Sequence, residues 1–577
     1  MSAMTRKFRL VLLAALWLAG SALHAQQVEV QVLGDHPRLQ DNAEAFIGEV
    51  EGRSEQRLRR YVPTAIRQVS EALRALGYYH PSIEWEMLDT ELPTVRLLVE
   101  PGEPVHVRSV SVTINGPADD DPAFLPVLPE KPAVGDVLNH GHYDALRQTI
   151  RNRALRLGYF DGEFSSHSLK VDTERRVADI ELVYDSGERY QLGEVSFLGD
   201  REIGEPLLRQ FVTITPGEDY HADKIATLNS DLSNSGYFRE VLVDANPADA
   251  VGRTIPVNVR LRIRAPRSVS AGVGFSTDVG PRFRGTWREH WINEMGHRRG
   301  AETELSDPRQ SLSTWYELPL DPPMTDLIRL TAGYQREDIE DVQSERLTMG
   351  QQWQHELDSG WLQILSLRWE GERFTIGEDR PNTSSLLLPG AGYSKLRADT
   401  ALDPSRGYRL QFDVTGAHRA ALSDADILHV SVLLKGLITA ADKHRFLGRF
   451  QFGGVATNNF DDVPPSLRFF AGGDQSVRGY GYETLSPEDS DGTLIGGRYL
   501  MVGSLEYQYS LFERWRAAIF YDRGNAIDNV FDPLANGAGI GVRWVSPVGP
   551  LRLDIAKGLD PEFGGEWRIH FSMGPEL

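Results

Sequence analysis

The most constraining feature of this chain is a change in the period of its hydrophobic pattern at Ser268. Before Ser268, several segments place apolar residues every three or four positions, as on one face of a helix. After it, short runs alternate between apolar and polar residues, as in a half-buried strand. The last run, 567–573, places Arg568, His570 and Ser572 on one face and only apolar residues on the other. The pattern predicts an α+β N-terminal half and an all-β C-terminal half.

Aromatic residues near both ends of successive strands distinguish the C-terminal half from most soluble β-proteins. Such girdles are typical of a transmembrane β-barrel, whereas a soluble sandwich or propeller, the alternative, alternates without them. We count 16 candidate antiparallel strands between Ser268 and Met573, with 14 as an alternative. An even number fits a closed barrel, and closure leaves no unpaired edge in lipid.

The first 25 residues have the pattern of a secretory signal peptide. Arg6, Lys7 and Arg9 precede the apolar run Leu10–Gly20, and small residues follow up to Ala25. This run is shorter than the roughly 20 residues that a membrane-spanning helix needs. We therefore expect export and cleavage near Ala25, with a buried N-terminal helix as the alternative.

Three segments of the N-terminal half end a helical pattern with glycine, tyrosine and a second aromatic residue. The glycines are Gly77, Gly158 and Gly236, spaced by 81 and 78 residues. Glycine just after a helix adopts the left-handed capping conformation without steric cost. Two strands follow each motif, as at Ser82–Leu88 and Thr94–Glu100, and a further strand opens each unit. The predicted order is strand, helix, helix, strand, strand.

This order resembles the POTRA domain, the periplasmic module of outer-membrane assembly proteins; the alternative is three generic α+β repeats. We expect a signal peptide at 1–25, POTRA modules at 26–101, 102–187 and 188–266, and a barrel at 267–577. The resemblance implies an exposed sheet edge that accepts an incoming strand through main-chain hydrogen bonds.

A long segment at about 456–498 lacks a strand pattern and combines glycines, aromatic residues and Arg478. Long loops in a compact domain are usually functional. If this loop enters the barrel, Arg478 needs a carboxylate, and Glu506 and Asp522 lie on the predicted lumen faces of the next two strands. The alternative is an exposed arginine with two unrelated acids.

The middle of the loop contains the sequence Val477, Arg478, Gly479 and Tyr480. This motif resembles one in the sixth extracellular loop of the BamA/TamA superfamily of outer-membrane assembly and translocation proteins. In that family, the loop arginine pairs inside the barrel with acids on the two following strands, and Glu506 and Asp522 match those positions. A second element, Asp403-Pro404 with Gly407, also resembles the family.

Three POTRA modules before a 16-stranded barrel match the TamA branch of that superfamily. The main assembly subunit resembles this chain but has five modules, and two-partner secretion transporters have two. The resemblance implies an outer-membrane barrel with periplasmic POTRA domains, surrounded by lipid. It further implies unfolded outer-membrane proteins such as autotransporters as substrates, and a TamB-like inner-membrane-anchored partner.

Glycines in the first strand and the shortness of the last predict a weakly paired seam. Gly272 and Gly274 lie in the first strand, and the last strand contains Ile569 and Phe571. Glycine inside a strand weakens it or marks a bend. A seam of this kind could open toward lipid and pair with an incoming strand.

Other classes of function are disfavoured by composition and motifs. The net charge of −21 argues against nucleic acid, which needs a basic face. The chain has no cysteine, and no segment shows a nucleophile elbow or a zinc-protease motif, so we expect no catalytic residue, cofactor or metal. The main rival from another class is a passive outer-membrane channel.

Overall fold

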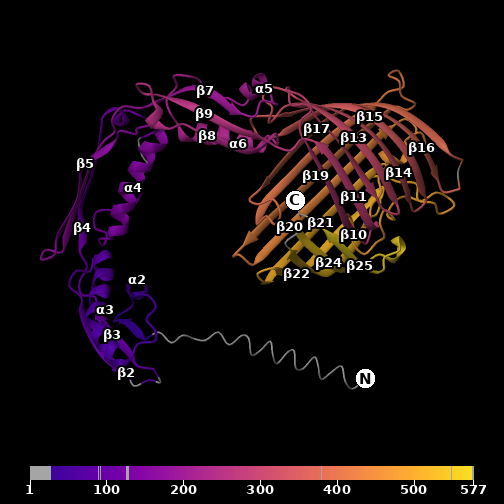
Figure 1. Cartoon of the computed structure of the whole chain (residues 1–577). Coiled ribbons are helices and arrows are strands. Elements are labelled where there is room, and N and C mark those ends of the chain that lie inside the picture. The colour runs from indigo at the N-terminus through magenta and orange to yellow at the C-terminus, as the bar shows by residue number, and fades with distance from the viewer. Residues whose placement is uncertain are drawn as a thin grey trace. The chain divides into compact units, whose positions relative to one another are not determined.

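The computed structural model describes residues 27–88, 90, 92–124, 129–378, 380–546 and 549–574. The signal peptide expected at 1–25 lies outside the described residues. Three small mixed sheets with helices are followed by one large antiparallel sheet (Figure 1). The predicted fold class is therefore confirmed. No helix within the described ranges is long and apolar enough to cross a membrane.

The first module is a three-stranded sheet packed against two helices. Strand β3 (Thr94–Glu100) lies in the middle, parallel to β1 (Val28–Val32) and antiparallel to β2 (Ser82–Leu88). Helices α2 (Pro37–Ile47) and α3 (Glu55–Ala75) bury their apolar faces against this sheet. The core contains Leu58, Val62, Val69 and Leu73 from α3 and Val95, Leu97 and Val99 from β3.

The second and third modules repeat this sheet order, with the last strand of each in the middle. The second contains β4 (His106–Asn115), η1 (Pro117–Asp119), α4 (His140–Leu157), β5 (Glu163–Asp172) and β6 (Val177–Asp185). The third contains β7 (Gln191–Gly199), α5 (Glu205–Arg209), α6 (Ala222–Asn234), β8 (Phe238–Asp244), η2 (Pro247–Asp249) and β9 (Thr254–Ile263).

The second module differs from the predicted order of elements. Where its first helix is expected, the described residues contain only η1, a single turn of 3-10 helix. Pro117 and Pro122 lie in this segment, and a proline inside a helix removes a hydrogen bond and clashes with the preceding turn. Two helices are therefore present in the first and third modules only, as far as the described residues show.

Each Gly-Tyr-aromatic motif ends its helix as predicted, and the first two also contact the module that follows. Gly77, Gly158 and Gly236 have φ values of +95°, +88° and +82°. The carbonyl of Gly77 accepts a hydrogen bond from Val105 N–H, and that of Gly158 accepts one from Tyr190 N–H, both at 2.9 Å. The motif therefore caps a helix and holds the start of the next module.

The aromatic residues of these two motifs add side-chain contacts at the same joints. The Tyr79 hydroxyl lies 2.7 Å from His140 Nε2 at the start of α4. The Phe160 ring lies edge-on to that of Tyr220, with centroids 4.9 Å apart. Aromatic pairs at this distance add to the stability that burial alone provides.

The C-terminal domain is a single sheet of 16 strands, in which each strand pairs antiparallel with the next along the chain. The predicted count of 16, rather than 14, is confirmed. The strands are β10 (Arg267–Ser276), β11 (Gly280–Glu289), β12 (Arg298–Leu305), β13 (Arg309–Pro319), β14 (Leu327–Ile339), β15 (Val342–Glu356), β16 (Leu362–Ile376), β17 (Asn382–Ala398), β18 (Arg406–Ala417), β19 (Ile427–Ala440), β20 (His444–Thr457), β21 (Tyr499–Phe512), β22 (Trp515–Ile527), β23 (Ala535–Ser546), β24 (Gly549–Gly558) and β25 (Trp567–Met573). Two 3-10 helices, η3 (Pro465–Leu467) and η4 (Pro561–Phe563), lie between strands.

Alternation along the strands separates an apolar outer face from a polar interior. On β21, Leu505 is 70% exposed, whereas Gln508 is fully buried. On β22, Ile519 is 57% exposed, whereas Asp522 is fully buried. Apolar outside and polar inside is the reverse of a soluble protein and suits a barrel surrounded by lipid.

Candidate functional site

The loop between β20 and β21, residues 458–498, fills part of the barrel interior. Its side chains make one buried apolar cluster with residues of the barrel wall. Polar contacts reach other strands: Ser466 hydrogen-bonds Glu372 on β16, and Arg309 on β13 lies 3.4 Å from the Tyr482 hydroxyl. The apolar cluster includes Val463, Leu467, Phe469, Val477 and Tyr480 from the loop and Leu386, Leu388, Leu500 and Val502 from the wall.

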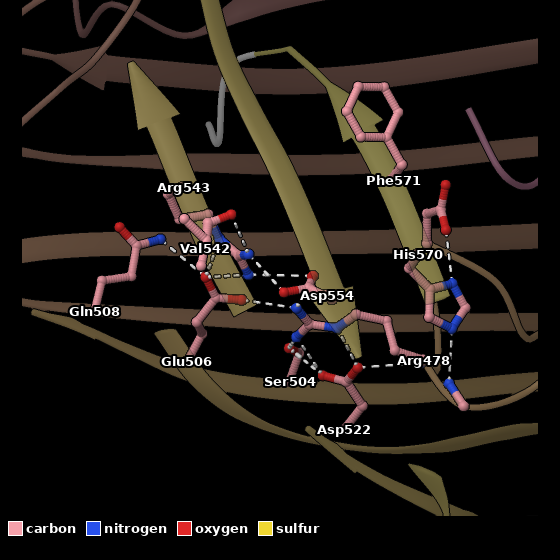
Figure 2. A network of polar contacts seen from close by, with 12 residues as sticks. Arg478, Ser504, Glu506, Gln508, Asp522, Val542, Arg543, Asp554, His570 and Phe571 are labelled. Carbon is pink, nitrogen blue, oxygen red and sulfur yellow. Dashed lines mark hydrogen bonds and ion pairs between the residues drawn. The ribbon is translucent and has the colours of Figure 1, made fainter. Parts of the chain in front are cut away.

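Arg478 extends from this loop to the strands that follow it. Its Nε and Nη2 donate to Asp522 Oδ2 and Oδ1 at 2.7 and 2.9 Å, so that the planar guanidinium grips the carboxylate with two parallel bonds (Figure 2). Nη1 donates to Glu506 at 2.8 Å, and the guanidinium carbon lies 3.3 Å from the centroid of the Phe520 ring. The two acids singled out in the sequence therefore both contact Arg478.

A second arginine and a third acid, both missed in the sequence, complete the network. Arg478 Nη1 also donates to Asp554 on β24 at 3.1 Å. Arg543 on β23 contacts Asp554 at 2.5 Å and Glu506 at 2.8 Å, so it bridges two of the acids that Arg478 binds (Figure 2). Alternation alone places Arg543 and Asp554 on the lumen faces, but nothing in the sequence shows that they meet Arg478.

The network is almost completely removed from solvent. Arg478 is 7% exposed, Arg543 is 1% exposed and Asp522 is fully buried. A buried charge is tolerated when a partner neutralises it and further hydrogen bonds satisfy it. Ser504 and Gln508 supply such bonds to Asp522 and Glu506, at 2.5 and 2.8 Å. The arrangement therefore holds the loop tip in one position.

Glycines let the loop backbone approach the barrel wall closely. Gly479 has a φ of +96°, and a Cβ there would lie 2.3 Å from the nitrogen of Gly558 on β24. A Cβ at Gly537 would lie 2.0 Å from the Arg478 carbonyl oxygen, and one at Gly541 would lie 1.8 Å from Asp554. The glycines of β23 therefore make room for the loop backbone and for the Asp554 carboxylate of β24, in agreement with the close approach that strand glycines allow.

The two ends of the sheet, β10 and β25, meet without a regular ladder in the described residues. Thr277 N–H donates to Phe571 O at 3.2 Å, and Phe571 N–H donates to Thr277 Oγ1 at 3.0 Å. By contrast, β25 pairs with β24 at seven positions. The barrel is therefore nearly closed, with a seam linked by few hydrogen bonds.

The four residues predicted at the seam lie on these two strands. Gly272 and Gly274 lie in β10, where a Cβ at Gly272 would meet no atom within 4 Å. On β25, Ile569 is 63% exposed and the Phe571 ring lies 6.1 Å from that of Phe275. A Cβ at Gly274, by contrast, would lie 3.0 Å from Arg282 Nε, so only Gly272 has open space around it.

A second polar cluster lies beside the seam and was missed in the sequence. Asp278 in the β10–β11 hairpin, Asp474 in the loop and His570 on β25 place one potential ligand atom each within 4.8 Å of one another. Burial and then the charge of Asp474 raise the pKa of Asp278 above its usual value. These residues come from three distant parts of the chain, so no sequence spacing could reveal them.

The element Asp403-Pro404 with Gly407 also contacts charged side chains that face the lumen. Asp403, in the β17–β18 turn, accepts hydrogen bonds from Arg445 at 2.7 Å and from Arg516 at 2.6 and 2.9 Å. Two guanidiniums therefore hold this turn against the first residues of β20 and β22. Arg516 lies on the same face of β22 as Asp522, as alternation predicts.

Two family models match this chain. Residues 297–576 match the Omp85 superfamily domain, and residues 29–101 match the POTRA domain described as TamA domain 1. The first match covers the barrel from β12 onward, including the loop and the three acids. The second covers the first module.

The chain is also similar in sequence to two named proteins. The chain is 24% identical over 439 residues to "Outer membrane protein assembly factor BamA" of Nitratidesulfovibrio vulgaris, covering 72% of this chain and 55% of that protein. It is 22% identical over 425 residues to a protein of the same name from Neorickettsia risticii, covering 66% and 54%. The chain thus spans about half the length of these two relatives.

A solved structure shares the fold. The crystal structure of BamA from Haemophilus ducreyi lacking POTRA domains 1–3 superposes with a TM-score of 0.68 and 16% identity, covering 82% of this chain and 99% of that one. At this identity, the likeness is one of fold.

Proposed function

Since this chain carries an Omp85 superfamily domain behind a POTRA domain of the TamA type, we propose that it is a translocation and assembly factor for outer-membrane proteins. The barrel lies in the outer membrane and the POTRA domains lie in the periplasm. In the proposed role, the protein provides a folding template at its seam and catalyses no chemical reaction.

The observation that carries the proposal is the seam between β10 and β25. An edge strand with free N–H and C=O groups accepts another strand by main-chain pairing, largely regardless of sequence. Within lipid, such an edge is costly unless it is paired. Pairing with an incoming β-strand would therefore satisfy the backbone N–H and C=O groups of both strands. The anchored loop fits this role because it fixes the wall strands β21, β22 and β24 through Arg478, and it contacts the β10 edge at Thr277 and Asp278, beyond the end of the strand.

Substrates and partners follow from the family resemblance. We propose unfolded outer-membrane proteins, autotransporters among them, as substrates, and a TamB-like inner-membrane-anchored protein as the partner of the POTRA domains. The match of residues 29–101 to a TamA-type POTRA domain supports this branch. The names of the two relatives favour a second candidate, the main assembly subunit of the same superfamily.

Photocrosslinking tests the proposed substrate path. A photoreactive residue in place of Val273, which lies on β10 and is 84% exposed, should crosslink to an autotransporter arrested during assembly. The matched control is Leu330 on β14, also on the outer face and 44% exposed, which should give no adduct. Equal crosslinking at both positions, or none at Val273, would rule out substrate pairing at the seam.

A further inference from the structure

Three segments that are distant in sequence meet at the outer end of the seam. Since β10 begins after the periplasmic modules, the hairpin that follows it, with Asp278, lies on the outer side of the membrane. Asp474 from the loop and His570 from β25 reach the same point. The cluster therefore includes both sides of the seam and the loop that carries Arg478.

The hydrogen bonds of His570 show that its imidazole positions Asp474 and is not itself free to bind a ligand. Gly479 N–H donates to Nε2 at 2.9 Å, so this nitrogen carries no proton. The ring proton is then on Nδ1, which donates to Asp474 Oδ1 at 2.7 Å. The Thr277 hydroxyl donates to the same oxygen at 2.8 Å.

The other oxygen of Asp474 has no such partner. Its side chain is only 3% exposed, and Oδ2 accepts no hydrogen bond from the described residues. Next to it, Asp278 accepts the backbone N–H of Asp474, at 2.9 and 3.1 Å, and no other hydrogen bond from the residues that the structure describes. Neither carboxylate forms an ion pair with a lysine or arginine in the described part of the chain.

A buried carboxylate oxygen without a donor, facing a second carboxyl group, is unfavourable unless a shared proton or a bound cation neutralises the pair. We propose that Asp278 and Asp474 bind a hard divalent cation of the Ca²⁺ type at the outer end of the seam. Such ions prefer carboxylate oxygens and water, at about 2.3 to 2.6 Å from the ion, so two oxygens bound to one Ca²⁺ can lie up to roughly 5 Å apart. Ligand oxygens of Asp278 and Asp474 lie within 4.8 Å of each other, which fits this limit.

The cation links the two edges of the sheet through the loop. It joins the β10–β11 hairpin to Asp474, and the Asp474–His570 hydrogen bond carries the link to β25. Arg478 lies four residues from Asp474 in the same loop. The loop segment 474–478 is therefore held at one end by the cation and at the other by the ion pairs of Arg478. Cation binding therefore favours the closed seam.

Calcium titration of the full chain in detergent, after removal of divalent ions with a chelator, tests the site. Isothermal titration with Ca²⁺ should show one site, with a Kd of about 10⁻⁴ to 10⁻³ M, the range of extracellular calcium modules. Asp278→Asn and Asp474→Asn should each weaken binding by about tenfold or more, since affinity depends on the number of charged ligands. Asp307→Asn, in the exposed β12–β13 hairpin, is the matched control and should bind as the wild type does.

Amide hydrogen exchange gives a second readout that does not depend on binding heat. Ca²⁺ should slow exchange at the Phe571 amide about tenfold in the wild type and in Asp307→Asn, but not in Asp278→Asn. A Ca²⁺ response that is equal in all variants, or absent from the wild type, would overturn the site. The photocrosslinking result at Val273 is independent of either outcome.

Discussion

Removing Arg478 has different consequences for the three carboxylates that it binds. Glu506 and Asp554 keep Arg543 as a partner. Among the described residues, Asp522 keeps hydrogen bonds from the Ser504 hydroxyl and from the backbone N–H of residue 478, but no contact with a guanidinium. The fully buried Asp522 is therefore the residue left uncompensated.

Arg478→Ala should lower the stability of the folded barrel by about 3 to 5 kcal/mol, the usual effect of leaving one charge of a buried pair. The temperature at which the barrel loses its compact migration on denaturing gels measures this change. Adding Asp522→Asn should recover part of the loss, because the unpaired charge is then removed. Arg419→Ala is the control, since its pair with Asp462 is exposed and contributes at most about 1 kcal/mol. A double variant no more stable than Arg478→Ala would contradict this account.

Gly479→Ala tests the close approach of the loop to the wall. Both Gly479 and Gly492 lie in the loop and have positive φ, +96° and +82°, so alanine costs about 1 to 2 kcal/mol of backbone strain at either. Only at Gly479 would the added Cβ meet another backbone, that of β24. We expect protease to cut the loop of Gly479→Ala while that of Gly492→Ala stays resistant. Equal resistance would show that the loop does not need this contact.

Among the elements of the N-terminal modules, the Gly-Tyr-aromatic motif both ends a helix and contacts the module that follows. A Cβ at Gly158 would lie 2.6 Å from Tyr220 Cβ, whereas one at Gly236 would meet nothing within 4 Å. The first reason for glycine, a left-handed cap, can be read from the sequence because it is local. The second cannot, because Tyr220 is distant from Gly158 in sequence.

Gly158→Ala should therefore disturb the contact between the second and third modules, whereas Gly236→Ala should not. Both substitutions impose a similar free-energy cost of placing alanine at positive φ. The Tyr190 amide, which donates to the Gly158 carbonyl, should exchange its hydrogen faster in Gly158→Ala only. Hydrogen exchange resolved by peptide measures this in the full chain. Unchanged protection of Tyr190 would contradict a role for the motif in joining modules.

Across the whole molecule, the strands and the faces of their side chains could be predicted from the sequence, whereas contacts between residues distant in sequence could not. Alternation predicted 16 strands and the lumen faces of Glu506 and Asp522, because strand period is a local property. It did not predict that Asp554 would meet Arg478, nor that Asp474 would meet His570, because the curvature of the sheet decides which strands face the loop tip. Among the described residues, the second module has only η1 where the repeat pattern predicted a first helix, and Pro117 and Pro122 lie in that segment.

In the proposed function, assembly proceeds through an opening between β10 and β25. The chain has no cysteine, so an introduced pair of cysteines has no native thiol with which to form other disulfides. Phe275→Cys with Phe571→Cys, joined by a disulfide or a short bismaleimide, ties the seam where the two rings now meet. Leu553→Cys with Phe571→Cys ties two strands that are already paired and is the control.

The measurement is the folding of an autotransporter into liposomes that contain each tethered protein. The account predicts that the seam tether reduces folding to the level of empty liposomes, that reductant restores it for the disulfide form, and that the control tether has no effect. Full activity of the seam-tethered protein would contradict the account.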